Sequence, residues 1–457
     1  MNIQASETEV TTVSAAQKRD AYLKDLLGTV KAVVPAGLAL PSLRGAAEAL
    51  VSERSFPSNR DEEWRFTDLS AMLAVPFKAG SEPVAVEADA MVKDRLQEAI
   101  ASLNLPETAG TRLVFVNGLY SADLSSTEAL PEGVIVGNLA NLYSNSDLQG
   151  KLDQRLGRQS GSHEVFTALN TAGFQDAAVI WVPRNRAVEA SIQVIYVSVP
   201  QAEAAIAQPR CLVVAESGSA LTLVEEFWGV DSGAHFTNAV SEIWVDENAE
   251  VTHIRVQREG LGTFHIGKTA ATQARDSRYR CTAISLGAQV FRHHLEMYQA
   301  GEQTDTKLYG LNAIAQSQIA DTHSLIALAH PHGTVDQLHK CIVDDRAHGV
   351  FSGMIAVPHN AQMTSASQLN RNLLLSDKGR VDTKPQLDIV ADNVKCSHGA
   401  TISQLEADEI FYLQSRGIEA AQAQRLLLYA FAMEVIESIP VESLRAALTQ
   451  QITKQTS

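Results

Sequence analysis

Cysteines are scarce in this sequence, and no two of them lie close together. Only four occur in 457 residues, and no C-x-x-C motif is present. Their spacing excludes both a disulfide framework and a self-contained four-cysteine metal site, so a metal cluster would need ligands from elsewhere. The four are Cys211, Cys281, Cys341 and Cys396.

Long apolar runs, basic clusters and targeting signals are also missing. No apolar run approaches the 18 or so residues that cross a bilayer, so we expect no membrane span. The net charge is -16 and no Lys/Arg cluster interrupts it, which argues against nucleic acid as a partner. The first twenty residues contain no apolar core and carry Glu7 and Glu9, which predicts neither export nor organelle import. We therefore expect a cytoplasmic protein.

Signals for tight hairpins are absent where strand-like runs are most frequent. Between residues 180 and 400 there is no Asn-Gly, Asp-Gly or Gly-Gly, although short strand patterns recur throughout 178–400. In "VTHIRVQ" (251–257), apolar and polar residues alternate with the period of a strand that has one covered face. More than 200 residues of such strands exceed a usual sandwich and favour stacked rungs of a parallel β-solenoid. Two stacked sandwiches are the alternative.

Helical patterns appear at both ends of the chain. Apolar residues have helical spacing in 17–33 and again in 92–105. The tail predicts a helix that ends at Gly417, followed by an unusually apolar helix in 419–439 that must be covered by this chain or a partner. The expected organisation is a mainly helical region 1–110 with a polar leader, a β-solenoid core 111–402 and a C-terminal helical domain 403–457.

The segment "GTFHIGKT" (262–269) satisfies the P-loop pattern, with Lys268 and Thr269 in the nucleotide-binding positions. A P-loop needs a glycine-rich turn after a buried strand and a helix N-terminus directly after the turn. Here the residues between the glycines have a strand pattern, so we interpret the match as a coincidence. A P-loop nucleotide-binding enzyme remains the alternative function, and a carbohydrate-acting solenoid enzyme is less favoured because such enzymes are typically exported.

Histidines are frequent in 323–359, including His330-x-His332 and His339-x-Cys341. Spacing of two on a strand places both side chains on one face, as metal-binding barrels present their ligands. Pro331 fits a turn better than a central strand. Structural histidines are the favoured interpretation of this span.

The stretch "VKCSHGAT" (394–401) places Cys396 and His398 on one face of a predicted strand. Thiolate and imidazole both ligate iron in cluster sites. From spacing alone, a metal-facing pair and a half-buried thiol beside a hydrogen-bonded imidazole both remain open.

Six segments together resemble one family. They run in order from about residue 56 to about 437 and are similar to signatures of the SufB/SufD family, which belongs to the SUF machinery for iron-sulfur cluster assembly. "EEWRFTDL" and "VKCSHGAT" favour the SufD members. The segments are "SNRDEEWRFTDL" (58–69), "FTALNTAGFQDAAVIWVP" (166–183), "GVFSGMIAV" (349–357), "QLNRNLLLSDKG" (368–379), "KPQLDIVADNVKCSHGAT" (384–401) and "EADEIFYLQSRGI" (406–418).

The resemblance implies a right-handed parallel β-helix between helical ends, and a scaffold that is not an enzyme. Its implied partners are SufB, through the β-helix, and the ATPase SufC, through the helices of 403–457. His398 occupies the position that contributes, with a SufB cysteine, to a transient cluster shared with SufB. Cys396 ranks second, as a ligand, a sulfur acceptor or a packed thiol. The resemblance leaves open whether reduced flavin (FAD) joins the complex and whether the chain alone is a homodimer. Ser352 and Met354 depart from the family pattern of Asn and Lys, which puts in doubt an interface role for both.

Overall fold

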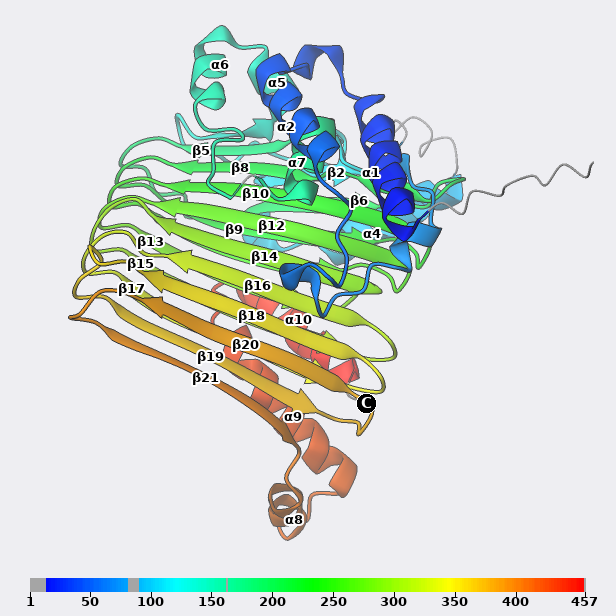
Figure 1. Cartoon of the computed structure of the whole chain (residues 1–457), viewed down its shortest axis with the longest axis vertical. Coiled ribbons are helices and arrows are strands. Elements are labelled where there is room, and N and C mark those ends of the chain that lie inside the picture. Colours follow the sequence, from blue (N-terminus) through cyan, green and yellow to red (C-terminus); the bar gives the residue numbers. More distant parts are fainter. Residues whose placement is uncertain (1–13, 81–89, 162, 456–457) are drawn as a thin grey trace, which may run out of the picture.

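The computed structural model describes residues 14–80, 90–161 and 163–455. The strands of these residues form two sheets, which are the two walls of a solenoid (Figure 1). The first sheet contains β1 (Lys78–Ala79), β4 (Ile135–Asn138), β5 (Ala178–Val182), β7 (Ala205–Ala207), β8 (Arg210–Ala215), β10 (His235–Val245), β12 (Thr263–Gln273), β14 (Val290–Gln299), β16 (Ile319–Ala327), β18 (His348–Val357) and β20 (Arg380–Ile389). The second contains β2 (Arg112–Val116), β3 (Leu119–Tyr120), β6 (Ile192–Ser198), β9 (Ala220–Gly229), β11 (Glu250–Arg258), β13 (Arg278–Ser285), β15 (Asp305–Ile314), β17 (Thr334–Val343), β19 (Ser365–Leu374) and β21 (Lys395–Gln404).

From β8 onward, successive strands alternate between the two sheets, and each of β8 to β19 pairs in parallel with the strand one turn further along. Ile319 of β16, for example, lies beside His348 of β18, which is 29 residues later. Antiparallel pairing occurs at the start of the solenoid, between β2 and β3 and between β4 and β5. The predicted mainly β fold, a parallel solenoid with helical regions at both ends of the chain, is confirmed. Two stacked sandwiches are excluded, because their strands would pair antiparallel.

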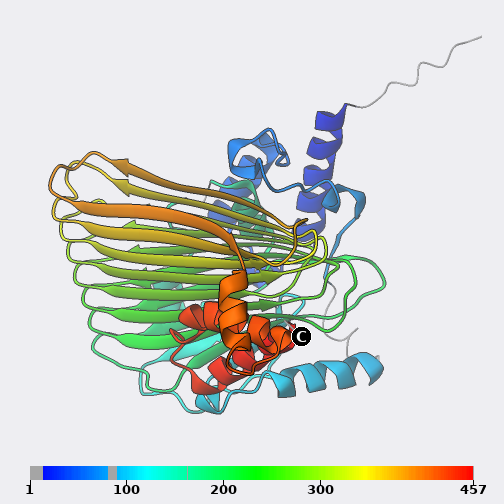
Figure 2. The same cartoon turned by 90° about the horizontal axis from the view of Figure 1, so that it is seen from below.

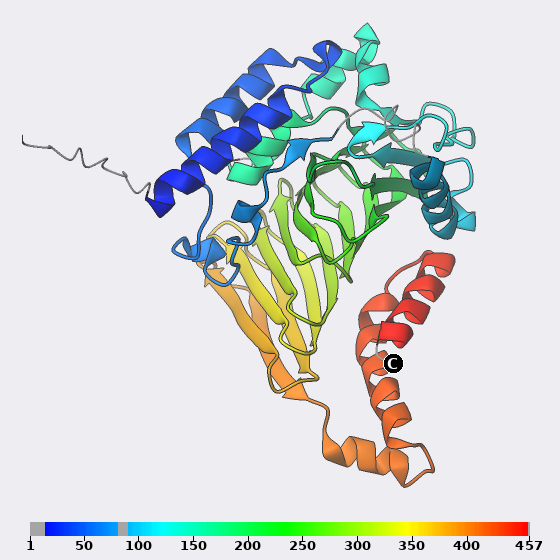
Figure 3. The same ribbon diagram turned by 90° about the vertical axis from the view of Figure 1, so that its right-hand side faces the viewer.

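Helices from the N-terminal half pack on the beginning of both sheets (Figures 1 and 3). They are α1 (Ala15–Lys31), α2 (Pro41–Glu53), α4 (Ala90–Ser102), α5 (Leu139–Tyr143), α6 (Ser146–Asp153) and α7 (Val165–Gly173). Ser14 caps α1 with a reciprocal capping box, and the apolar stripe predicted in this helix is buried. Gly173 lets α1 and α7 touch, since a Cβ there would lie 2.3 Å from Val30. Helices α5 to α7 fall inside the range 111–402, and the three domain boundaries stay a prediction.

The C-terminal helices lie on the opposite side of the molecule, where the last two of them run along the outer face of the second sheet (Figures 2 and 3). They are α8 (Ala407–Gln414), α9 (Ala420–Ile436) and α10 (Glu442–Gln455). Part of the apolar surface of α9 and α10 is thus covered by this chain's own sheet. One core cluster joins sheet residues to helix residues: Val224, Ile254, Val256, Ile284, Leu311, Ile342, Leu428, Val435, Ile436, Leu444 and Leu448.

The strand β11 corrects the prediction of one covered face for 251–257, because both of its faces are buried. Ile254 and Val256 belong to the cluster with α9 and α10. The polar residues of the strand belong to the opposite face and are at most 2% exposed: His253, Arg255 and Gln257. Ile254 and Val256 therefore pack outward under helices, whereas the three polar side chains point into the solenoid.

A network of ionisable side chains fills this part of the interior. His253 Nε2 lies 2.7 Å from Glu225 Oε2, and His265 Nδ1 lies 2.5 Å from Glu259 Oε2. Burial alone would lower the pKa of His253, but hydrogen bonds to Cys281 and Glu225 raise it to about 9. Burial would raise the pKa of Glu259, but His265 lowers it to about 2. Each of these two buried carboxylates therefore lies within hydrogen-bond distance of a buried imidazole.

Candidate functional site

The two residues favoured by the sequence lie on β21, the last strand of the second sheet. Among the described strands it pairs with β19 alone, so its other edge is unpaired in this part of the chain (Figure 1). Cys396 lies beside Ala366 and His398 beside Gln368 in the parallel register. Paired residues of a parallel ladder share a face, and both β19 residues are buried in the interior. Cys396 and His398 therefore line the open end of the solenoid interior.

Their environments differ. Cys396 is half-buried and packs against the main core, and burial raises the pKa of its thiol. A thiol with a raised pKa is a weaker nucleophile and a weaker metal ligand, because the thiolate is the reactive form. His398 is exposed, and its imidazole makes no hydrogen bond with any residue that the structure describes. The geometry thus leaves the imidazole accessible and makes the thiol the less reactive of the two.

Few potential metal ligands gather at the open end in the part of the chain that the structure describes. Within residues 14–80, 90–161 and 163–455, no three His, Cys, Asp or Glu side chains converge to form a metal site. Metal clusters in proteins commonly have four protein ligands. Cys396 and His398 offer two potential ligands, so a cluster with four ligands would need others besides them.

The P-loop alternative is wrong, because Lys268 and Thr269 lie inside the long strand β12 and no helix begins there. Lys268 is an outward-facing, buried residue, whose Nζ donates hydrogen bonds of 2.6 Å to Gly161 O and Glu296 Oε1. Thr269 faces the interior and lies 3.0 Å from His293 Nε2. The pair therefore has a structural role.

The buried ion pair makes a stability prediction for Lys268→Ala. Lys268 and Glu296 each expose about 5% of their side chains. Removing one partner of such a pair leaves an uncompensated charge and costs about 3 kcal/mol. We expect the midpoint of urea unfolding to fall in Lys268→Ala, and to recover partly when Glu296→Gln is added. An unchanged midpoint in the single variant would contradict this role.

The histidines of 323–359 are divided between a turn and the interior. His330 and His332 are exposed in the turn after β16, and a turn at this position was predicted from Pro331. His339 is buried beside Phe351, with 5.1 Å between ring centroids, and burial lowers its pKa to about 4. Cys341 is buried as well, which raises its pKa to about 12. This arrangement agrees with the structural interpretation of the span.

A groove on the outer face of the first sheet was not found from the sequence. It has a volume of about 720 Å³ and lies between residues 59–66 and the strands β14 to β20. Lys384 Nζ lies 2.8 Å from Glu62 Oε1, and this ion pair joins the two sides of the groove. His294, His323, Ser352 and Met354 are among the residues that line it. Residues 59–66 cross strands that follow about 230 to 330 positions later, and no local pattern predicts such a crossing.

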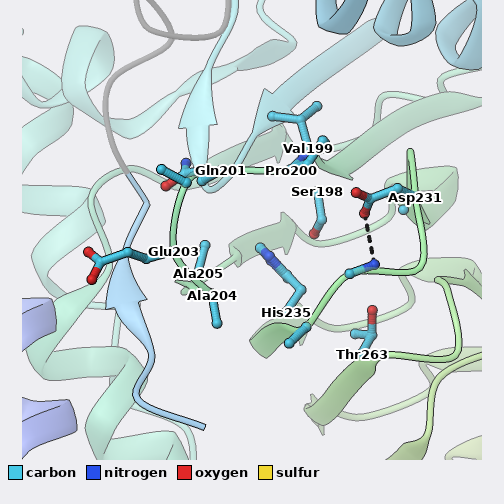
Figure 4. A pocket seen from close by; sticks show the side chains of 14 residues that line it. Ser198, Val199, Pro200, Gln201, Glu203, Ala204, Ala205, Asp231, His235 and Thr263 are labelled. Atoms are coloured by element: carbon cyan, nitrogen blue, oxygen red, sulfur yellow. Dashed lines mark hydrogen bonds between the residues drawn. The ribbon is translucent and has the colours of Figure 1, made fainter.

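A smaller cavity of about 170 Å³ lies near the other end of the solenoid, where β6 and β9 end and β10 and β12 begin (Figure 4). His235 lies among Ser198, Ala205 and Thr263 in this view, and burial lowers its pKa to about 4. Asp231 accepts a hydrogen bond of 3.1 Å from the backbone of Gly233. Neither Cys396 nor His398 lines this cavity, so it is separate from the open end.

Together these features define a class of protein: a β-solenoid with helices on its outer faces and an exposed imidazole beside a half-buried thiol on its last turn. The family model for the SUF system FeS cluster assembly, SufBD core domain, matches residues 198–431. The model for the SufBD protein N-terminal region matches residues 27–194.

Relatives agree with these matches. An iron-sulfur cluster assembly SufBD family protein of Synechocystis is 46% identical over 421 residues, which are 90% of each chain. The chloroplastic protein ABCI7 of Arabidopsis thaliana is 34% identical over 97% of this chain and 93% of its own. The iron-sulfur cluster assembly protein SufD of Escherichia coli is 31% identical over 87% of this chain and 88% of its own. The chain belongs to the SufBD family of iron-sulfur cluster assembly proteins.

Proposed function

We propose that this chain is a non-enzymatic scaffold subunit of a SUF complex, which shares a nascent iron-sulfur cluster with a SufB-type partner at its open end. The observation that carries the proposal is the unpaired last turn, which presents an accessible imidazole, His398, and a half-buried thiol, Cys396. A site with one or two ligands from each chain holds a cluster weakly, which suits assembly and transfer. The cluster is cargo here.

The edge of the last turn supports docking of a β-rich partner. The strands β20 and β21 have unpaired backbone groups along their free edges, which can pair with a strand of another chain. Large apolar side chains are exposed beside them: Ile389, Val390 and Ile402. A second β-solenoid could continue both sheets, which matches the expected pairing with SufB.

The outer surface of α8 and α9 supports a second contact, with the ATPase SufC. Exposed apolar side chains cluster there: Phe411 (69% exposed), Tyr412 (58%), Leu426 (42%) and Tyr429 (38%). Packing on the second sheet buries one side of α9, with Leu428, Ala432, Val435 and Ile436, and leaves this surface exposed. Exposed aromatic residues of this size mark protein interaction sites.

Three further expectations stay predictions. They are a reduced flavin (FAD) in the assembled complex, a homodimer of the isolated chain and a cytoplasmic location. One relative is named a chloroplastic protein. The described part of the chain has no helix with the length and apolar character of a membrane-crossing segment.

Co-expression tests the assembly. With the SufB and SufC proteins of its own genome, the tagged full chain is expected to purify as a complex whose mass, measured by native mass spectrometry, accounts for all three chains. ATP hydrolysis should depend on SufC and be absent from this chain alone. Purification of the chain without either partner, or as a homodimer only, would contradict the proposed function.

A further inference from the structure

A row of hydrogen-bonded side chains runs through the solenoid interior toward the open end. Gln337 of β17 donates from Nε2 to Ser324 Oγ at 2.8 Å. Gln368 of β19 donates from Nε2 to Gln337 Oε1, also at 2.8 Å. Gln337 and Gln368 are paired in the register of their strands and are at most 1% exposed. In both links the side-chain amide donates to a side chain of an earlier strand, and Gln368 donates to the amide oxygen one turn before it.

Within the described part of the chain, Gln368 is the last residue of this row, and its side-chain oxygen lacks a hydrogen-bond donor. Gln368 Oε1 is buried and has no hydrogen-bond partner among the described residues. A buried acceptor without a partner is unfavourable, so a nearby donor gains free energy by approaching it. His398 occupies the next position of this row, because it pairs with Gln368 in the register and shares its face. Adjacent strands are about 4.8 Å apart, which is within the reach of an imidazole N-H.

One other buried group must be considered as a partner. His339 Nε2 also lacks a hydrogen bond among the described residues. His339 pairs with Asn370, however, and so belongs to the neighbouring row, one turn earlier than Gln368. Both links run from a later strand to an earlier one, and by the same direction His398, the register partner of Gln368 on the following turn, is the donor to Gln368 Oε1.

We propose that Gln368 is a positioning residue for His398, and that its Oε1 accepts a hydrogen bond from one ring nitrogen of the imidazole. The other ring nitrogen then carries the lone pair and points away from Gln368, toward the unpaired edge where a partner and iron would meet it. Histidines that bind metals commonly donate their second ring N-H to an oxygen in this way, which fixes the tautomer and the orientation of the ring. This inference rests on the proposed role of His398.

The test is the tautomer of His398 in the full chain, measured by ¹⁵N NMR of histidine-labelled protein at pH 8, where an ordinary imidazole is neutral. The His398→Gln variant assigns the signals. In wild type we expect one dominant tautomer. In Gln368→Leu the ratio of tautomers should change by about two- to fivefold, the effect of one lost hydrogen bond. Gln368→Glu retains an acceptor oxygen and should keep the wild-type tautomer dominant.

Ser367→Ala is the matched control, because Ser367 lies on the same strand but on its outer, exposed face. It should leave the tautomers unchanged, and thermal unfolding should show that every variant is folded. The same ratio in wild type and Gln368→Leu would overturn the inference, as would loss of the dominant tautomer in Gln368→Glu.

Cluster content of the assembled complex separates this inference from the proposed function. If His398→Ala abolishes the cluster while Gln368→Leu affects neither tautomer nor cluster, only the positioning role fails. If His398→Ala leaves the cluster intact, the proposed function of His398 fails, whatever the tautomer does. Support for both requires less cluster in Gln368→Leu and recovery in Gln368→Glu.

Discussion

In complexes with its partners, the His398→Ala variant is expected to assemble normally and to carry about a tenth or less of the wild-type cluster. The substitution removes the accessible imidazole from the open end and adds no bulk. Mutating a residue that only hydrogen-bonds to a metal ligand commonly lowers metal affinity 10- to 100-fold. Removing the ligand itself should therefore lower the cluster content by at least as much. Cluster absorbance and acid-labile sulfide of the co-purified complex measure the effect.

Cys396→Ser provides the internal comparison for this prediction. It changes the half-buried thiol of the same strand and should reduce the cluster less, because burial keeps that thiol protonated. Gel filtration of both complexes must show normal assembly. If the His398→Ala complex contains as much cluster as wild type, the imidazole is structural and the role assigned to the open end is wrong.

The second large effect is expected at the apolar surface of α8. Phe411→Asp places a charge on the most exposed of its aromatic residues, which is 69% exposed and packs against nothing in this chain's core. Burying an unpaired carboxylate in an interface is costly, so binding of SufC should weaken by a factor on the order of 100. Calorimetric titration of the full chain with SufC measures the change.

Leu261→Asp is the matched control for Phe411→Asp, because Leu261 is also an exposed apolar residue, at 43%, but lies in the turn between β11 and β12. Its affinity for SufC should equal that of wild type. A point substitution is preferable to removal of 403–457, because α9 and α10 also cover the outer face of the second sheet. Equal affinity of Phe411→Asp and wild type would contradict the docking surface.

Local pattern was enough to predict the solenoid and the face of the last strand. The absence of tight-turn pairs in 180–400 and the recurrence of strand patterns led to parallel stacking, which the registers confirm. The spacing of two between Cys396 and His398 placed both on one face, because the side chains of a strand alternate. These are properties of neighbouring residues and can be read from the chain directly.

Other features depend on contacts across many residues. The alternation in 251–257 distinguished two faces but not which one points inward, because the covering helices α9 and α10 come about 170 residues later. Gln368 could not be linked to His398, since the link is a register between strands 30 residues apart. The groove under residues 59–66 was missed for the same reason.

The ionisable network in the interior limits how this solenoid can change its length. Glu225, His253 and His265 belong to β9, β11 and β12, so their partners are distributed over successive turns. In an ordinary repeat protein each unit contacts only equivalent neighbours, and whole units can be duplicated or deleted. Deleting one turn here would leave a buried ionisable side chain without its partner. The turns are therefore not interchangeable modules. The number of turns, and with it the distance from the N-terminal helices to the open end, is fixed.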